Sequence, residues 1–185
     1  HAHSAVTRAE VNVPEDACIF LYAGVLNSRK NIVWLIENFV RYHENDEYLL
    51  VLGSGEKEAE CKAKADDHVR MLGFQTDPIA YMNISDVYVS ASKSEGFSIS
   101  VLEALSCGLE LFLSNIPSHE EVVSMGRTIP VGELFDEKNI GGAFDNIRSI
   151  HSNKDKIIEF QRENLSACKM AELYNSEYQK IERTQ

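Results

Sequence analysis

Residues 17–24 read ACIFLYAG, an unbroken apolar run that stops at a glycine. Such a run is typical of a strand that is covered on both faces, because neither face then meets water. A loop follows over residues 25–30. Beyond it, apolar side chains recur at helical spacing, at Ile32, Leu35, Ile36, Phe39 and Val40. The order strand, loop and helix is the repeating unit of a parallel sheet covered by helices.

The same alternation continues toward the C-terminus. We expect further strands over residues 48–52, 69–72, 87–91 and 109–113, and an edge strand over residues 128–131. The helices are expected over residues 56–67, 76–84, 98–107 and 119–124, followed by helical residues 136–150 and a helical tail over residues 153–183. Since crossovers between parallel strands are right-handed, the predicted fold class is α/β, a doubly wound, Rossmann-like parallel sheet.

Charge and composition exclude several classes of function. The 185 residues carry 18 Lys and Arg against 29 Asp and Glu, and this net charge of −11 would repel a nucleic acid. The longest apolar stretches, residues 19–26 and 48–52, are far shorter than the roughly 20 residues of a transmembrane segment. Cysteines at positions 18, 61, 107 and 168 have the spacing of neither a zinc site nor a disulfide framework. We therefore expect a globular protein of a reducing cytosol, with no nucleic acid partner.

Ligands of open parallel sheets bind beyond the carboxyl ends of the strands, so the loops that follow the strands are the places to search. The most informative loop is residues 92–105, SKSEGFSISVLEAL, which follows a predicted strand and opens a helix. Gly96 lets a ligand approach the backbone, and the free amides of residues 97–100 can bind phosphate oxygens. Glu95 and Glu103 flank this anion site. A carboxylate repels phosphate but accepts hydrogen bonds from hydroxyl groups, so the two glutamates suit the hydroxyls of a long ligand.

This stretch resembles the EX7E motif of retaining glycosyltransferases with the GT-B fold, specifically family 4 (group 1), because seven residues separate Glu95 from Glu103. The resemblance extends over most of the chain, through motifs that follow in the family's order. These are Lys30-Asn31, Gly53-Ser54-Gly55, Leu72-Gly73-Phe74 and Ser85-Asp86-Val87-Tyr88. The family has two Rossmann-like domains, and these residues are similar to its C-terminal, nucleotide-sugar-binding one.

The resemblance implies a role for each matching residue. Glu95 would contact hydroxyls of the donor sugar and Lys30 the donor diphosphate, and both would act in catalysis; Glu103 would hold the ribose. The other implied donor-binding residues are Gly96, Phe97, Ser98, Ile99 and Ser100 on the sugar and phosphate, and Gly73 and Phe74 on the base. The implied reaction uses no metal and no cofactor, since the UDP- or GDP-sugar is itself the substrate.

Two positions depart from the family pattern. Val25 stands where the family has an arginine after the first-strand glycine, and Arg29 is the nearby candidate to replace that diphosphate contact. Glu110 stands where the family has a proline, a difference that we interpret as structural.

Alternative interpretations stay open. Glu95 and Glu103 could be solvated charges at a helix start, which the helix dipole favours, and Lys30 could be a surface lysine. The Gly53-Ser54-Gly55 turn lacks a third glycine and is followed by acidic residues, which argues against a dinucleotide fingerprint. The whole protein could be a non-catalytic nucleotide-sugar-binding subunit, which Val25 would favour. It could also be a GT-B epimerase that acts on the nucleotide sugar itself.

The expected organisation is that of one half of an enzyme. Residues 1–16 are expected to be a linker or cloning remnant, residues 17–152 the donor-binding domain, and residues 153–185 a helical segment that packs toward an N-terminal GT-B domain. Its docking stripe would consist of Met170, Tyr174, Tyr178 and Ile181. We expect the isolated chain to bind donor without transferring sugar to a glycan or lipid-linked acceptor. The expected location is the cytoplasm, with peripheral membrane contact through the N-terminal domain.

Overall fold

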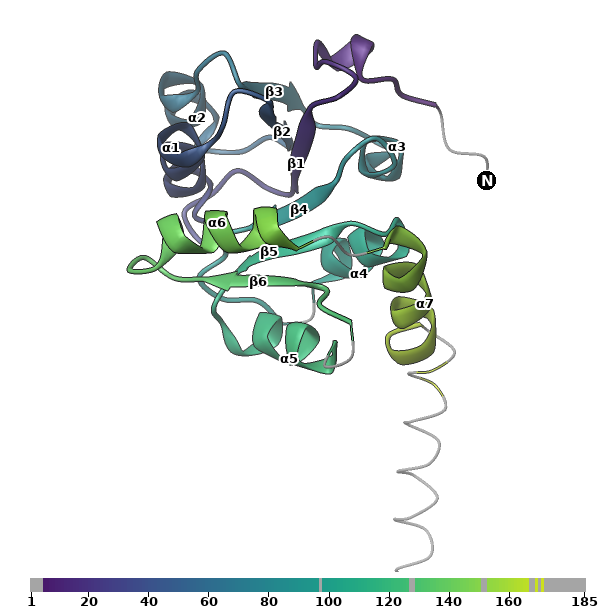
Figure 1. Cartoon of the computed structure of the whole chain (residues 1–185). Coiled ribbons are helices and arrows are strands. Elements are labelled where there is room, and N and C mark those ends of the chain that lie inside the picture. The colour runs from purple at the N-terminus through teal and green to yellow at the C-terminus, as the bar shows by residue number, and fades with distance from the viewer. Residues whose placement is uncertain are drawn as a thin grey trace, which may run out of the picture.

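The fold is a six-stranded parallel sheet with helices on both faces (Figure 1). The computed structural model describes residues 5–96, 98–126, 129–150, 153–166, 169 and 171. The strands are β1 (Cys18–Ala23), β2 (Glu47–Leu52), β3 (Val69–Gly73), β4 (Val87–Ser90), β5 (Glu110–Ser114) and β6 (Gly132–Phe135). Their order in the sheet is β3-β2-β1-β4-β5-β6, and every neighbouring pair is parallel. This is a doubly wound order, which confirms the predicted fold class.

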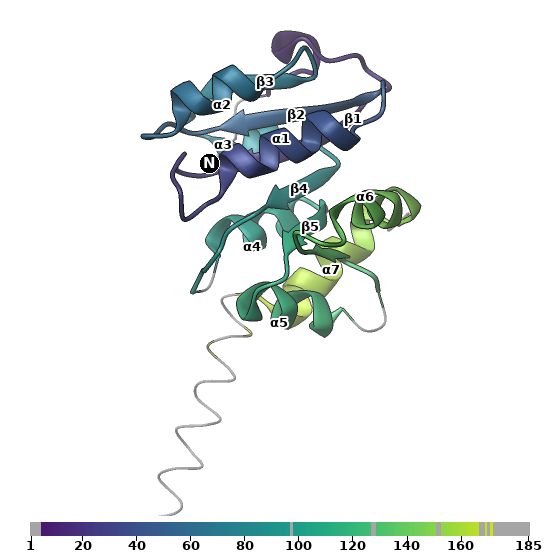
Figure 2. The same cartoon turned by 90° about the vertical axis from the view of Figure 1, so that its left-hand side faces the viewer.

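Two layers of helices cover the sheet, as the view turned by 90° also shows (Figure 2). One face carries α1 (Ile32–Tyr42), α2 (Glu58–Lys64) and α6 (Ile140–Ser149). The other face carries α3 (Pro78–Met82), α4 (Ile99–Ser106), α5 (Pro117–Met125) and α7 (Lys154–Asn164). A single turn of 3-10 helix, Ala9–Val11, precedes β1. None of the helices in the described part of the chain is long and apolar enough to cross a membrane.

The apolar run of β1 is explained by its place in the middle of the sheet. Ile19 and Leu21 point into the core beneath α4 and α7, whereas Phe20 and Tyr22 point into the core beneath α1 and α6. All four side chains are at most 1% exposed. Because each such side chain contributes about 1.5–3 kcal/mol when it is fully buried, both layers of helices are anchored on this one strand.

The last strand begins later than the sequence predicted. We expected an edge strand over residues 128–131, but β6 pairs with β5 only from Gly132, opposite Leu111. Pro130 has no N–H to donate to a neighbouring strand. Gly132 approaches β5 so closely that a Cβ at this position would lie 2.0 Å from the Leu111 carbonyl oxygen. Residues 127 and 128 lie outside the described residues.

Three helices are shorter than expected. The helix predicted over residues 136–150 begins only at Ile140, because the Asp136 carboxylate accepts the N–H groups of Lys138 and Asn139 and holds a turn there. The helices predicted over residues 56–67 and 76–84 are reduced to α2 and α3. α3 starts late because the Asp77 carboxylate accepts the Ala80 N–H at 3.4 Å and caps the helix. The helix predicted over residues 153–183 is interrupted, because α7 ends at Asn164 and residues 165 and 166 are not helical. The remaining described elements agree with the prediction within two residues.

Residues 8–13 are part of the domain, so the expectation of a linker over residues 1–16 is wrong for this stretch. Val11 and Val13 are buried in the core beneath α4 and α7. The Arg8 guanidinium donates to the Ala17 carbonyl and lies 3.1 Å from the Asp86 carboxylate. Residues 1–4 lie outside the described residues.

The start of the predicted tail also belongs to this domain. α7 packs on α4, and its Ile157 and Phe160 are buried in the same core. The predicted docking stripe of Met170, Tyr174, Tyr178 and Ile181 lies outside the described residues, so its role stays a prediction.

Candidate functional site

The loops that follow β1 and β2 are pressed together at the carboxyl edge of the sheet. The Gly24 N–H donates to the Leu52 carbonyl at 3.0 Å, and the Gly53 N–H donates to the Gly73 carbonyl at 2.7 Å. At Gly53 φ is 137°, and a Cβ would lie 1.8 Å from the Gly24 carbonyl oxygen. Only glycine fits this backbone and this approach. The residues after β1 are therefore fixed beside the crevice between β1 and β4, where the strand order reverses.

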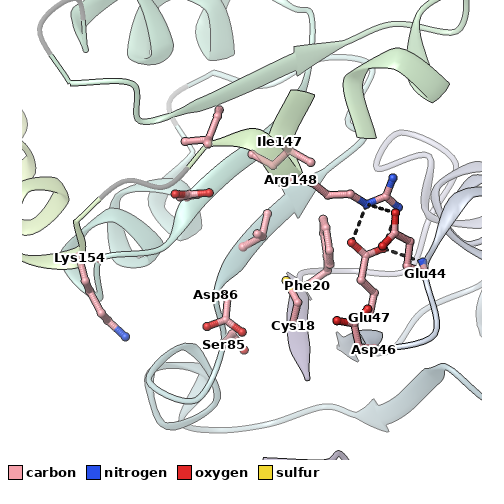
Figure 3. Close-up of a pocket in the computed structure, with 14 residues that line it drawn as sticks. Cys18, Phe20, Glu44, Asp46, Glu47, Ser85, Asp86, Ile147, Arg148 and Lys154 are labelled. Atoms are coloured by element: carbon pink, nitrogen blue, oxygen red, sulfur yellow. Dashed lines mark hydrogen bonds and ion pairs between the residues drawn. The ribbon is translucent and has the colours of Figure 1, made fainter. Parts of the chain in front are cut away.

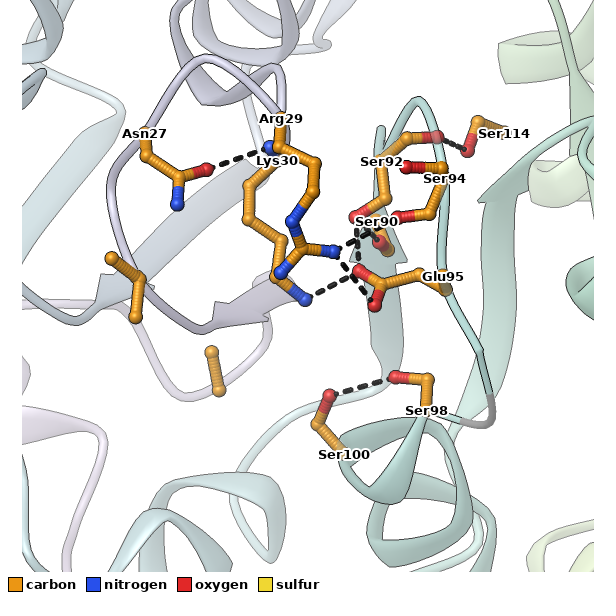
Figure 4. A network of polar contacts seen from close by, with 12 residues as sticks. Asn27, Arg29, Lys30, Ser90, Ser92, Ser94, Glu95, Ser98, Ser100 and Ser114 are labelled. Atoms are coloured by element: carbon orange, nitrogen blue, oxygen red, sulfur yellow. Dashed lines mark hydrogen bonds and ion pairs between the residues drawn. The ribbon is translucent and has the colours of Figure 1, made fainter.

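Lys30 is presented by the loop between β1 and α1. The Asn27 side-chain oxygen accepts the Lys30 N–H at 2.9 Å, which closes the loop. Asn31 then adopts left-handed backbone, with φ at 54°, and turns the chain into α1. The Lys30 side chain points across the crevice toward the loop that follows β4 (Figure 4).

Glu95 lies at the centre of a polar network in that loop (Figure 4). Its Oε1 accepts from the Lys30 ammonium and, at 2.7 Å, from the Ser92 hydroxyl. Its Oε2 accepts from the Arg29 guanidinium at 3.1 Å. Arg29 also donates to the Ser94 carbonyl at 2.9 Å. The structure thus brings together three residues that the sequence singled out, two of them from the loop before α1 and one from the loop before α4.

The Glu95 carboxyl is held ionised. Its side chain is only 10% exposed, and this burial opposes ionisation. The hydrogen bonds from Lys30, Ser92 and Arg29 outweigh the burial and lower the pKa of Glu95 to about 2. At neutral pH Glu95 is therefore a hydrogen-bond acceptor with no proton to give.

The lowered pKa of Glu95 makes part of the stability depend on pH. In the unfolded chain the carboxyl has an ordinary pKa of 4.5, so its contribution to the free energy of unfolding is fully present above pH 4.5 and is lost as the pH falls toward 2. The Glu95→Gln variant lacks this contribution. We expect the stability difference between the parent and this variant, measured by urea unfolding, to shrink as the pH is lowered from 5 to 3. A difference that stays constant over that range would contradict the lowered pKa.

The start of α4 adjoins this network. Its N-cap residue Ser98 makes no side-chain capping hydrogen bond within the described part of the chain. Instead the Ser98 hydroxyl lies 3.1 Å from the Ser100 hydroxyl, which accepts from the Tyr88 hydroxyl at 2.8 Å. Burial raises the pKa of Tyr88 to about 12, so its hydroxyl keeps its proton. The first amides of α4 therefore remain available to an anion. Phe97 lies outside the described residues.

A cavity of about 280 Å³ lies beside the first turns of α4. Val25, Phe74, Ser100 and Glu103 line it, together with the glycine loops that follow β1 and β2. Phe74 is 72% exposed and Val25 is 55% exposed, so both offer apolar surface. Burial raises the pKa of the Glu103 carboxyl. The cavity thus gathers the sequence-predicted residues Glu103, Ser100 and Phe74, and it places the unusual Val25 among them.

A larger cavity, of about 580 Å³, lies at the opposite end of the strands (Figure 3). Its lining includes Cys18 and Glu47, the first residues of β1 and β2. Arg148 donates to both carboxylate oxygens of Glu47, at 2.8 and 2.9 Å, and to the Tyr42 carbonyl at 2.6 Å. These charges are paired within the fold, and ligands of such sheets bind at the other edge. We therefore place the candidate site at the carboxyl edge.

Two side chains that support Glu95 and the start of α4 were not predicted from the sequence. Ser92 is 1% exposed and bonded to Glu95, and Tyr88 bonds to Ser100. The sequence signal that could have identified Ser92 is its place at the end of a buried strand. A hydroxyl buried there needs a hydrogen-bond partner, and Glu95 is close by in the sequence. Within the described residues, no group of three or more His, Cys, Asp or Glu side chains could hold a metal ion.

Comparison with known proteins identifies the family of the chain. The family model described as "Glycosyl transferases group 1" matches residues 4–166. The O-antigen biosynthesis glycosyltransferase WclY of Escherichia coli is 28% identical over 185 residues, covering 95% of this chain and 50% of WclY.

Solved structures show the same fold. The lipopolysaccharide outer core galactosyltransferase WaaB has a TM-score of 0.75 at 21% identity, over 92% of this chain and 52% of WaaB. HepE of Anabaena, solved with UDP and glucose, has a TM-score of 0.69 at 16% identity, over 91% of this chain and 51% of HepE. The chain spans about half the length of these relatives.

Proposed function

The chain belongs to the group 1 glycosyltransferases, and on that premise we propose that it is the donor-binding half of a retaining enzyme. The enzyme moves a sugar from a nucleoside-diphosphate sugar to a hydroxyl acceptor in glycan or polysaccharide synthesis. The observation that carries this proposal is the spatial order of the polar groups along the carboxyl edge of the sheet. The cluster of Arg29, Lys30 and Glu95 comes first, then the start of α4, then the cavity with Glu103. A nucleotide sugar has its sugar, diphosphate and nucleoside in the same order.

The nucleoside occupies the cavity in this proposal. Glu103 is an acceptor for the two ribose hydroxyls, whose hydrogen bonds offset the cost of burying its charge. Phe74 and Val25 supply apolar surface for the base, and the backbone of Gly73 and Phe74 reads its edge.

The diphosphate lies between Lys30 and the first amides of α4, at Ser98, Ile99 and Ser100. Arg29 joins it, since a guanidinium has five N–H donors and its described hydrogen bonds use only those on Nη1. In this way Arg29 compensates for Val25, which cannot contact a phosphate. Cations placed here stabilise the negative charge that the leaving nucleoside diphosphate develops as the bond to the sugar breaks.

The donor sugar lies against Glu95. The carboxylate accepts a hydrogen bond from a sugar hydroxyl, and its negative charge stabilises the positive charge that the sugar ring develops in the transition state. The pKa of about 2 supports this role, because it keeps the charge in place throughout the physiological range.

The acceptor half of the enzyme is the N-terminal GT-B domain in this proposal. Relatives are named for O-antigen and lipopolysaccharide core biosynthesis, which points to a glycan or lipid-linked acceptor. The reaction would then take place in the cytoplasm, with the enzyme held peripherally at the membrane where such an acceptor resides. UDP is the first donor nucleotide to test, because HepE was solved with it, and GDP is the second.

Titration calorimetry of UDP and GDP into the chain tests the donor site. We expect Lys30→Ala and Glu103→Ala each to weaken binding of the preferred nucleotide by about 1–3 kcal/mol, the scale of a lost hydrogen bond to a charged group. Lys62→Ala and Glu60→Ala are matched controls on the exposed face of α2 and should change the affinity less than about twofold. Unchanged affinity in both site variants would overturn the assignment.

A non-catalytic nucleotide-sugar-binding subunit is the second candidate, and Val25 is the observation that favours it. The whole protein decides between the two: an enzyme releases free nucleoside diphosphate when donor and acceptor are both supplied. Conversion of the donor without any acceptor would indicate an epimerase instead.

A further inference from the structure

Ser92 holds Glu95 from the end of a strand. It is 1% exposed and follows β4 by two residues. Its hydroxyl donates to Glu95 Oε1 at 2.7 Å and accepts from the Ser90 hydroxyl at 3.2 Å (Figure 4). Hydrogen bonds that run in one direction polarise one another, so the donation to Glu95 is strengthened by the bond behind it.

The backbone of Ser92 is itself held from β5 and α5. The Ser114 hydroxyl, at the end of β5, donates to the Ser92 carbonyl at 2.6 Å. His119 Nδ1 lies 2.9 Å from the Ser114 carbonyl, and because a carbonyl oxygen only accepts, Nδ1 carries the proton. His119 is 1% exposed, burial lowers its pKa, and its Nε2 has no hydrogen-bond partner within the described part of the chain. The neutral imidazole thus serves to hold Ser114.

The other two partners of Glu95 differ from Ser92 in one respect. Lys30 and Arg29 carry positive charge on long side chains, so an arriving diphosphate competes with Glu95 for them. Ser92 is neutral, short and buried, and a diphosphate does not draw it away. Once the donor is bound, Ser92 is the partner that keeps Glu95 in place.

We propose that Ser92 is a positioning residue that fixes the Glu95 carboxylate against the donor sugar, and that Ser114 and His119 hold Ser92 for this task. The inference rests on the proposed function for the identity of the sugar ligand. The hydrogen bonds that link His119, Ser114, Ser92 and Glu95 do not depend on that function. A carboxylate has about four acceptor positions, and the described contacts of Glu95 use three. The fourth is on Oε2, so anchoring Oε1 on Ser92 aims the open position at the sugar hydroxyl.

The first experiment measures how well Glu95 is ordered, without any donor. Lys30→Ala combined with Arg29→Ala removes both cations from Glu95, and side-chain couplings of Glu95 measured by NMR then report whether it keeps a single rotamer. We expect one rotamer in this double variant and rotamer averaging in the triple variant that also carries Ser92→Ala. Ser85→Ala is the matched control, because Ser85 is also buried and donates to a carbonyl, that of Tyr81 at 2.8 Å, but at the other end of β4. An ordered Glu95 in the triple variant would overturn the proposal.

The second experiment compares the affinity of UDP with that of UDP-glucose, and of GDP with GDP-mannose, for the whole chain. For each base, the contribution of the sugar is the dissociation constant of the bare nucleotide divided by that of the nucleotide sugar. We consider the nucleotide and nucleotide sugar for which the sugar increases the affinity of the parent chain. For this pair Ser92→Ala should reduce the ratio about 10-fold and leave the affinity of the bare nucleotide unchanged. Ser114→Ala should reduce it less, and Ser85→Ala not at all. An equal loss for the bare nucleotide and the nucleotide sugar would mean that Ser92 is only part of the scaffold, and would overturn the proposal.

The two experiments separate the two hypotheses. If Ser92→Ala releases Glu95 but neither nucleotide binds the parent, the positioning role stands and the proposed donor fails. If the nucleotides bind and Glu95 stays ordered in the triple variant, the donor site stands and the positioning role fails.

Discussion

Replacing Glu95 by glutamine is expected to slow sugar transfer by the whole enzyme about 100-fold or more. Glutamine keeps the size of the side chain but removes the charge that, in the proposed function, faces the reacting sugar. The same change removes a negative group next to the proposed diphosphate site and frees Lys30 and Arg29, which pair with Glu95. UDP or GDP alone should therefore bind to Glu95→Gln as tightly as to the parent, or more tightly.

These opposite signs make the experiment decisive. Steady-state transfer gives the rate, and calorimetry with the bare nucleotide gives the affinity. Glu103→Gln is the matched control: it lines the cavity, so it should weaken the nucleotide and affect the maximal rate much less. If Glu95→Gln loses rate and nucleotide affinity to the same extent, Glu95 is a scaffold charge. If it loses neither, Glu95 takes no part in binding the nucleotide or in transfer.

Gly53→Ala is expected to cost about 3 kcal/mol or more of folding stability. The added Cβ would lie 1.8 Å from the Gly24 carbonyl oxygen. Because a Cβ and a carbonyl oxygen are both attached directly to the backbone, neither can rotate away, and the loops after β1 and β2 must move apart. The φ of 137° at this position adds strain for any residue with a Cβ. Because Gly24 and Gly53 frame the cavity, nucleotide binding should fall with stability.

The same substitution at Gly142 is the matched control, with the opposite sign. Gly142 lies within α6, and a Cβ there meets nothing within 4 Å. Alanine is the better helix former by about 1 kcal/mol, so Gly142→Ala should stabilise the chain slightly and leave nucleotide binding unchanged. Urea unfolding of the two variants tests both signs together. A Gly53→Ala protein as stable as the parent would mean that the two loops are not in contact as described.

The fold could be predicted because its main determinants are local. A buried strand such as β1 requires consecutive apolar residues, and α1 requires apolar residues at helical spacing, and both patterns are visible without knowledge of any neighbour. The start of β6 could not be predicted. Apolar character favours residues 128–131, but pairing depends on how closely Gly132 approaches Leu111 on the adjacent strand, 21 positions earlier in the sequence.

For the site, the sequence by itself determined which groups are present: two glutamates at a helix start with seven residues between them, a lysine after the first strand, and Val25 in place of an arginine. Only the tertiary structure decided how they combine. Lys30 and Glu95 are 65 positions apart and meet because β4 lies beside β1. Ser92 reaches Glu95 from the end of β4, and Ser114 reaches Ser92 from β5. Such contacts depend on strand order and on how closely the loops fit together at the sheet edge. Both result from packing between distant parts of the chain, so a local stretch of sequence does not reveal them.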